Sequence, residues 1–227
     1  GLYTSPHLKE FRERIKINGK MIGEQEVMNF VSANKKLFED LEMSFFEMTV
    51  TMAFDYFAKN QVDIAIIECG LGGRLDSTNI IDPELTIITN IGLDHTDLLG
   101  DTLEKIAVEK AGIIKTNRPI IIGKEQKETK NIFGEKAKEK HAPLYIAEQG
   151  KQIETDLKGK YQIENSNTAL KVIELLKGSG WNITEENIRH GFKSVIKNTG
   201  LLGRWQILNN KPLSICDAAH NEDGIQL

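Results

Sequence analysis

The chain has 227 residues, 40% hydrophobic and 27% charged, with a net charge of −4, as is typical of a soluble globular protein. Its lysine-rich stretches are interleaved with glutamates, which argues against a nucleic-acid surface. No apolar run approaches the length of a membrane span. The two cysteines form no disulfide framework, so we expect a reducing cytoplasmic setting.

The hydrophobic pattern alternates between strand-like and helix-like segments. In chain order it predicts a strand at the very start, helices over 24–41 and 46–60, strands over 62–69 and 85–92, a helix over 102–115, a strand over 118–123, a helix over 127–141, a strand over 143–147, helices over 165–180 and 184–198, a strand over 213–218 and the start of a helix after it. The strand runs are apolar without alternation, which is typical of strands buried on both faces. The pattern therefore predicts an α/β fold, with a mostly parallel sheet flanked by helices.

Polar side chains follow two of these strand runs. Glu68 stands near the end of one run, and Asp94 with His95 follows the next. Because open parallel sheets bind ligands beyond the carboxyl ends of their strands, we expect these groups at one sheet edge. A carboxylate and an imidazole together suit a divalent cation. The alternative is structural: Glu68 pairs with Arg74, and His95 is an ordinary loop histidine.

Three glycines, Gly70, Gly72 and Gly73, follow shortly after Glu68. Glycine allows a sharp turn and a close approach of the backbone to a ligand, which is the role we expect here. The spacing is not that of a dinucleotide-binding loop, and the printed chain contains no GxxxxGK[ST] phosphate loop.

Eight segments together resemble the folylpolyglutamate synthase/dihydrofolate synthase family of the Mur ligase superfamily. They are "GLYTSPHL", "ERIKING", "SFFEMT", "ECGLGGRLDSTNII", "TNIGLDHTDLLGDTLEKIAVEKAGIIK", "YQIENSNTAL", "GRWQIL" and "DAAHNEDGI". The resemblance covers nearly the whole chain. It implies a central ATPase domain over residues 1–200, then a linker and the beginning of a Rossmann-like glutamate-ligase domain over 201–227.

The resemblance also implies a reaction. ATP phosphorylates the carboxylate of dihydropteroate or of a folate, and the amine of L-glutamate then attacks the acyl phosphate. Cations offset the repulsion between the two anions that must meet, so Mg²⁺ is expected and a monovalent cation is allowed for. The implied partners are ATP, L-glutamate and a folate or dihydropteroate. We expect a cytoplasmic monomer without nucleic-acid or membrane partners.

Individual residues take roles through the same match. The resemblance implies metal ligands at Ser5, Glu68 and His95, a catalytic role for His95, a carbamate-bearing lysine at Lys110, ATP contacts at Asn165, Arg204 and Asp217, and folate or dihydropteroate contacts at Ser44, Phe45, Phe46, Glu47 and Leu75. Structural alternatives stay open. They are a turn or cap for Ser5, a solvated helix lysine beside Glu109 for Lys110, and core packing for the two phenylalanines.

The family's glycine-rich "GTNGKGS"-type phosphate loop is missing from the printed residues. We therefore expect residues 1–227 to be an N-terminally truncated piece, with most of the C-terminal domain also missing, and inactive as a ligase by itself. Two other hypotheses are a truncated chain that keeps the fold without ATP turnover, and a Mur-type ligase for cell-wall precursors. The "TSPHL", "ERIKING" and "LDSTN" blocks weigh against the last.

Overall fold

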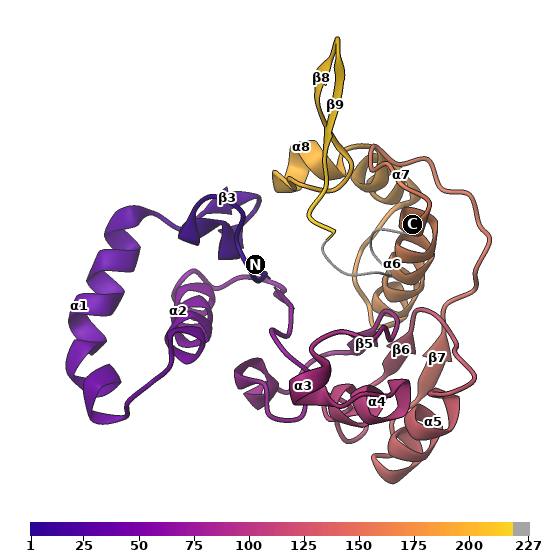
Figure 1. Cartoon of the computed structure of the whole chain (residues 1–227), viewed down its shortest axis with the longest axis horizontal. Helices are drawn as coiled ribbons and strands as arrows, with labels where there is room; N and C mark the ends of the chain where they lie inside the picture. The colour runs from indigo at the N-terminus through magenta and orange to yellow at the C-terminus, as the bar shows by residue number, and fades with distance from the viewer. Residues whose placement is uncertain (220–227) are drawn as a thin grey trace. The chain divides into compact units, whose positions relative to one another are not determined.

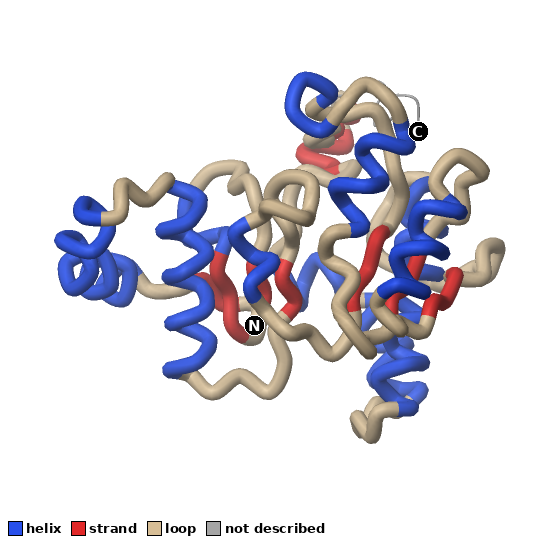
Figure 2. The backbone as a smooth tube through the Cα atoms, turned by 90° about the horizontal axis from the view of Figure 1, so that it is seen from below, coloured by secondary structure: helices blue, strands red, loops and turns tan. Residues whose placement is uncertain are grey.

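The computed structural model describes residues 1–219 (Figure 1). Its contacts divide the chain into two compact units, which we call the first unit (1–71 with 75–81) and the second unit (72–74 with the chain from residue 82 onward). Both units combine helices with short strands (Figure 2). The expected domain boundary at residue 200 lies within the second unit and stays a prediction. The helix expected to start after residue 218 falls mainly on 220–227, outside the described residues.

A four-stranded sheet forms the centre of the first unit, in the order β3-β2-β1-β4. The strands are β1 (Leu2–Tyr3), β2 (Ile15–Ile17), β3 (Lys20–Met21) and β4 (Ile66–Ile67). β1 runs parallel to β4 and antiparallel to β2. The structure thus confirms the strand expected at the start of the chain and shortens the one expected over 62–69.

Two long helices pack beside this sheet: α1 (Glu24–Asp40) and α2 (Phe45–Lys59). A 3-10 turn, η1 (Phe11–Arg14), precedes β2, and a second one, η2 (Ser77–Ile80), ends the unit. The buried core includes Tyr3, Ile15, Phe38, Val50 and Phe57. Both helices lie within one residue of their expected limits, because their apolar face repeats with the helical period.

The second unit contains the parallel sheet that the sequence predicts, in the order β5-β6-β7. Its strands are β5 (Thr86–Ile88), β6 (Ile120–Ile122) and β7 (Leu144–Ile146). The helices α4 (Leu103–Ala111) and α5 (Lys130–Glu139) share a core with β5 and β6, while α6 (Tyr161–Gly178) lies on the other side of the sheet (Figure 1). The expectation of a parallel sheet with helices on both faces is confirmed.

Several details differ from the sequence expectations. The runs over 62–69 and 85–92 do not neighbour each other in one sheet, because β4 pairs with β1 while β5 pairs with β6. The helix expected over 184–198 breaks at Ser194 into α7 (Glu185–Lys193) and α8 (Val195–Thr199). A short helix that the pattern did not predict, α3 (Thr96–Leu99), follows β5.

The run over 213–218 is not buried on both faces as expected. It forms β9 (Leu213–Cys216), which pairs antiparallel with the unpredicted β8 (Gln206–Asn210) in a two-stranded hairpin. Leu208 and Leu213 are each 63% exposed. A hairpin paired only with itself has no second layer to bury its side chains, whereas every residue of the central strand β6 is buried. No helix within residues 1–219 has the length and apolar character needed to cross a membrane.

A pocket of about 340 Å³ lies beside α5 and β7, lined in part by Phe133, Gly134, Leu144 and Ile146. A Cβ atom added at Gly134 would meet no atom within 4 Å. Replacing Gly134 with Ala should therefore raise the free energy of unfolding by about 0.5–1 kcal/mol, because a mid-helix glycine has more backbone entropy to lose on folding. Urea unfolding of the variant and the wild type measures this. A loss of stability would mean that the pocket wall is closed in solution.

Candidate functional site

The carboxyl ends of the parallel strands β1 and β4 bring Ser5 and Glu68 together in the first unit. The Glu68 N–H donates to the carbonyl of Tyr3 at 3.0 Å, continuing the ladder between the two strands. The Ser5 N–H donates to Oε2 of Glu68 at 2.9 Å. Two of the residues expected to bind the cation, 63 positions apart in the sequence, are therefore in direct contact.

The donor set at this strand end fits magnesium. A carboxylate and a serine hydroxyl are oxygen ligands of the kind that Mg²⁺ takes, usually few in number and supplemented by water. The Ser5 N–H holds the carboxylate in one orientation. His95, the third expected ligand, belongs to the second unit. Within residues 1–219, no three His, Cys, Asp or Glu side chains gather into a metal-binding group.

Tyr3, the last residue of β1, is fully buried. Its hydroxyl has no hydrogen-bond partner within the described part of the chain, and burial raises the pKa of Tyr3 to about 12, although Arg14 opposes the rise. The Tyr3 ring meets that of Phe46, with centroids 6.3 Å apart. A Cβ atom at Gly70 would lie 2.4 Å from the Phe46 ring, so Gly70 makes room for this side chain.

Asp76, which the sequence reasoning did not single out, organises the loop after Glu68. Its Oδ2 accepts from the N–H groups of Gly70 and Leu71, each at 2.8 Å. Its Oδ1 accepts from the N–H of Thr78 at 2.9 Å and from the Thr78 hydroxyl at 2.5 Å. An aspartate directly before a Ser-Thr pair is a recognisable cap and turn signal, which was the available clue.

Replacing Asp76 with Asn should lower the free energy of unfolding by roughly 2–3 kcal/mol. The amide keeps one acceptor oxygen but turns an NH₂ group toward N–H groups that have just lost their acceptor. Thermal unfolding measures the loss. Thr78→Val, which removes a single donor to the same carboxylate, should cost less. If both variants unfolded at the wild-type temperature, Asp76 would not be holding the loop.

The short segment after Leu71, Gly72–Arg74, docks against the end of α4 within the second unit. A Cβ atom at Gly73 would lie 3.0 Å from the carbonyl oxygens of Glu109 and Lys110. The Arg74 N–H donates to the Glu109 carbonyl at 2.9 Å, and the Arg74 guanidinium pairs with the Glu109 carboxylate at 3.0 Å. These glycines were expected to admit a ligand. In the structure the close approach is to the protein's own helix.

Lys110 lies in the last turn of α4 and is half-buried. Its neighbours on the same face of the helix and the turn after it are apolar: Ile106, Ala107, Ile113 and Ile114. Among the described residues, no carboxylate forms an ion pair with the Lys110 amine, and the adjacent Glu109 is paired with Arg74. The carbamate at Lys110 and the alternative of a solvated lysine both stay predictions.

The expected folate residues have two kinds of environment. Ser44 and Glu47 form a capping box at the start of α2, in which the Ser44 side chain accepts from the Glu47 N–H and the Glu47 carboxylate accepts from the Ser44 N–H. Hydrogen bonds from Ser44 also lower the pKa of Glu47. Phe45 and Leu75, by contrast, are 57% and 80% exposed. The Arg14 guanidinium lies 5.5 Å from the centroid of the Phe45 ring.

In the second unit, His95 is the N-cap residue of α3 and has a left-handed backbone (φ 50°). Its N–H donates to Oδ1 of Asp94 at 2.8 Å, and its imidazole Nε2 lies 3.9 Å from the same oxygen. The side chain is 55% exposed. His95 is thus presented to solvent on the loop that follows β5, which fits both a ligand contact and the alternative of an ordinary loop histidine.

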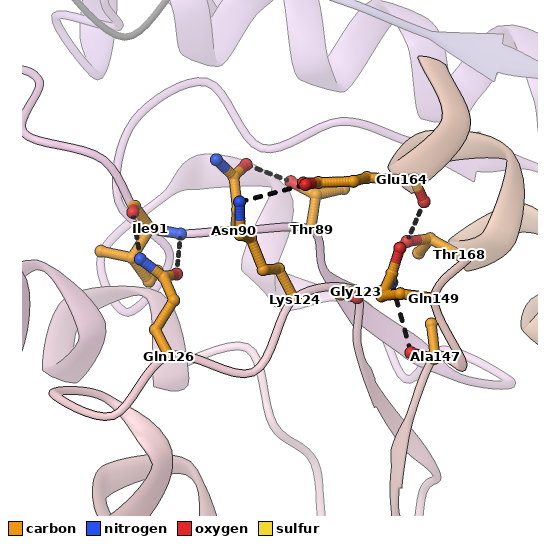
Figure 3. Close-up of polar contacts among 10 residues, drawn as sticks. All are labelled: Thr89, Asn90, Ile91, Gly123, Lys124, Gln126, Ala147, Gln149, Glu164 and Thr168. Atoms are coloured by element: carbon orange, nitrogen blue, oxygen red, sulfur yellow. Dashed lines mark hydrogen bonds and ion pairs between the residues drawn. The ribbon is translucent and has the colours of Figure 1, made fainter. Parts of the chain in front are cut away.

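The carboxyl ends of β5 and β6 meet the first turns of α6 in a polar cluster (Figure 3). The Lys124 N–H donates to the Thr89 carbonyl at 2.8 Å, and the Lys124 amine pairs with Glu164 at 3.1 Å. A Cβ atom at Gly123 would lie 2.5 Å from the Thr89 carbonyl and 2.6 Å from the Thr168 hydroxyl. This is the edge at which open parallel sheets bind ligands.

The three expected ATP residues come from segments that touch one another. The Trp205 N–H donates to Oδ2 of Asp217 at 2.6 Å, so Arg204 and Asp217 lie together at the base of the β8–β9 hairpin. The Tyr161 hydroxyl, at the start of α6, reaches the same oxygen at 3.5 Å. Asn165 lies one turn further along α6. Tyr161 opens the family-like segment "YQIENSNTAL", but the family resemblance assigned a role in that segment to Asn165 alone.

Known proteins resemble this chain in sequence and in fold. The family model for the Mur ligase middle domain matches residues 36–209. The dihydrofolate synthase/folylpolyglutamate synthase of Bacillus subtilis is 34% identical over 258 aligned positions, which cover 100% of this chain and 59% of that protein. The chain therefore spans about three fifths of this relative.

Solved structures also superpose on the chain. A complex of folylpolyglutamate synthase with AMPPCP and folate has a TM-score of 0.89 and 31% identity, covering 100% of this chain and 62% of that one. The FolC protein of E. coli in complex with DHPP and ADP has a TM-score of 0.85 and 33% identity, covering 99% of this chain and 56% of that one.

Proposed function

The chain belongs to the Mur ligase family through its middle domain, and from that premise we propose that its protein is an ATP-dependent ligase that adds L-glutamate to folates, to dihydropteroate, or to both. The observation that carries the proposal is the likeness, over essentially the whole chain, to structures that hold AMPPCP with folate and ADP with DHPP. We further propose that the protein works in the cytoplasm as a monomer.

The proposed chemistry has two steps. The substrate carboxylate attacks the γ-phosphoryl group of ATP to give an acyl phosphate and ADP. The amine of glutamate then attacks the acyl carbon, phosphate leaves, and an amide bond forms. Bound Mg²⁺ would supply positive charge where two anions are brought together.

The chain's own residues take the following parts in the proposal. Ser5 and Glu68 would hold the cation, supported by their contact at the end of β1 and β4. His95 is assigned as a third ligand and catalytic residue by the family resemblance. Lys110, half-buried and unpaired with any described carboxylate, would bear the carbamate and so bring a negative charge toward a cation.

For the folate side we propose that the exposed side chains of Phe45 and Leu75 contact the planar ring system of the substrate. Phe46 is the third apolar residue that we assign to this side. Aromatic faces favour offset stacking with such rings. Ser44 and Glu47 would act mainly by fixing the start of α2, since their polar groups bond to each other.

For the nucleotide we propose contacts from Asn165, Arg204 and Asp217. Replacing Arg204 with Ala should raise the KM for ATP about tenfold or more, because charge-assisted hydrogen bonds to phosphate are roughly twice as strong as neutral ones. The KM for the folate substrate should change little. Steady-state kinetics with each substrate varied in turn measures both values. Equal losses for ATP and folate would place Arg204 elsewhere.

A competition experiment separates this proposal from a Mur-type ligase for cell-wall precursors. A labelled folate bound to the protein with an ATP analogue should be displaced by unlabelled dihydropteroate or tetrahydrofolate. A UDP-linked muramoyl compound should leave it bound. Displacement by the muramoyl compound alone would favour the cell-wall alternative.

A further inference from the structure

Gln126 holds the backbone of Ile91 by both of its polar groups (Figure 3). The Ile91 N–H donates to Oε1 of Gln126 at 2.8 Å, and Nε2 of Gln126 donates to the Ile91 carbonyl at 2.8 Å. The two residues are 35 positions apart. Gln126 lies between β6 and α5, whereas Ile91 follows β5.

These two hydrogen bonds have no ready substitute. Ile91 is only 3% exposed, so solvent has little access to its N–H and carbonyl when the glutamine is absent. Among side chains, a primary amide is suited to satisfy one backbone donor and one backbone acceptor at once, because it carries both in a single plane. Removing it would leave two buried backbone groups unpaired, which is strongly disfavoured.

The loop held in this way carries Asp94 and His95. At its far end the loop is fixed by α3, since the His95 carbonyl accepts from the N–H groups of Leu98 and Leu99, each at 2.9 Å. At its near end, beyond the strand ladder, Gln126 provides the side-chain anchor. The left-handed backbone of His95 leaves this residue dependent on its surroundings, because a non-glycine residue adopts that conformation only when neighbouring contacts enforce it.

We propose that Gln126 is a positioning residue for His95: by fixing Ile91 it sets where the imidazole is presented to the bound cation. The inference rests on the proposed role of His95 as a metal ligand. Gln126 itself touches neither substrate nor cation. Its effect should therefore show as weaker metal binding and a more mobile loop, and not as a changed contact with the nucleotide.

The test uses Gln126→Met in the full-length protein, which keeps the length of the side chain and removes both hydrogen bonds. The probe is Mn²⁺, whose binding is followed by its electron paramagnetic resonance signal in the presence of an ATP analogue. Residues that orient a metal ligand typically contribute 10–100-fold to metal affinity, so the variant should bind Mn²⁺ at least tenfold more weakly. Amide hydrogen exchange should accelerate over residues 90–95.

Gln149→Met is the matched control. Nε2 of Gln149 donates to the carbonyl of Gly123 at 2.5 Å and to that of Ala147 at 3.2 Å, at the ends of β6 and β7 (Figure 3). The control removes the same amide and the same number of hydrogen bonds without touching the loop after β5. It should keep wild-type Mn²⁺ affinity. Should Gln126→Met fail to fold, Gln126→Glu replaces it, since this variant keeps an acceptor for the Ile91 N–H and loses only the donor.

A further variant, His95→Ala, separates failure of this inference from failure of the proposed metal role of His95. If His95→Ala weakens Mn²⁺ binding and Gln126→Met matches the control, the positioning role is wrong while the proposed function stands. If His95→Ala leaves Mn²⁺ affinity unchanged, the metal role of His95 is wrong, and the inference falls with it. Weaker binding in both, with a normal control, supports the inference.

Discussion

Replacing Glu68 with Gln in the full-length protein should lower the rate of glutamate addition by roughly 10²–10³. Glutamine keeps an oxygen that accepts from the Ser5 N–H, so the contact between the ends of β1 and β4 survives. What is lost is a negative charge facing the proposed cation. Electrostatic stabilisation of the transferring phosphoryl group depends on that cation. The stability of the fold does not depend on it, so the variant should still fold. The rate of ADP formation, measured with thermal unfolding on the same samples, separates the two effects.

Glu39→Gln is the control for this experiment. Glu39 lies on α1 in the same unit, and its side chain is exposed and paired with Lys35 across one helical turn. It should retain the wild-type rate. A Glu68→Gln protein that is as active as this control would remove Glu68 from the cation site. A Glu68→Gln protein that is insoluble would show instead that the carboxylate is structural.

Replacing Gly112 with Ala should destabilise the protein by about 3 kcal/mol or more, at the upper end of the range for overpacking. A Cβ atom there would lie 2.4 Å from Cα and Cβ of Arg74 and 2.7 Å from its backbone nitrogen. The obstacle is backbone, which moves less readily than a side chain. The φ of −60° at Gly112 suits any residue, so the expected loss is steric and not conformational.

The same substitution should also reduce activity. Pushing Arg74 away breaks its contacts with Glu109 and shifts the last turn of α4, which carries Lys110. Gly134→Ala is the matched control, because it makes the same chemical change in a helix with open space around it and should stabilise the protein. If Gly112→Ala were as stable as Gly134→Ala, the docking of residues 72–74 onto α4 would not exist in solution.

The sequence predicts those parts of the fold that local patterns encode. The helices of the first unit follow from apolar periodicity, whereas the three strands of the second unit's sheet and the strand at residue 2 follow from short apolar runs. Which strands pair with one another does not follow from these local patterns. The partner of β4 is β1, a strand of two residues whose paired positions lie 64 residues earlier, and no periodic pattern marks that choice.

The candidate site likewise combines residues that the sequence identifies with residues that act through distant contacts, which the sequence does not mark. Ser5 and Glu68 were identified from family-like segments, and the Ser5 N–H donates to the Glu68 carboxylate. Their role as cation ligands stays a prediction. Ser44 and Glu47 were assigned to folate, although the same Ser-x-x-Glu spacing also describes a capping box, which the structure contains. Gln126 and Gly112 act through contacts with segments more than 30 residues away, so nothing in their local sequence marks them.

The most direct test of the account is a ligation assay with the purified full-length protein, ATP, Mg²⁺ and L-glutamate, and either dihydropteroate or tetrahydrofolate. Mass spectrometry follows the pteridine substrate, and coupled assays follow ADP and phosphate. The account predicts a product heavier by one glutamyl residue, with one ADP and one phosphate formed for each glutamate added. ATP turnover without a glutamylated pteridine product, or glutamate addition to a muramoyl nucleotide instead, would contradict it.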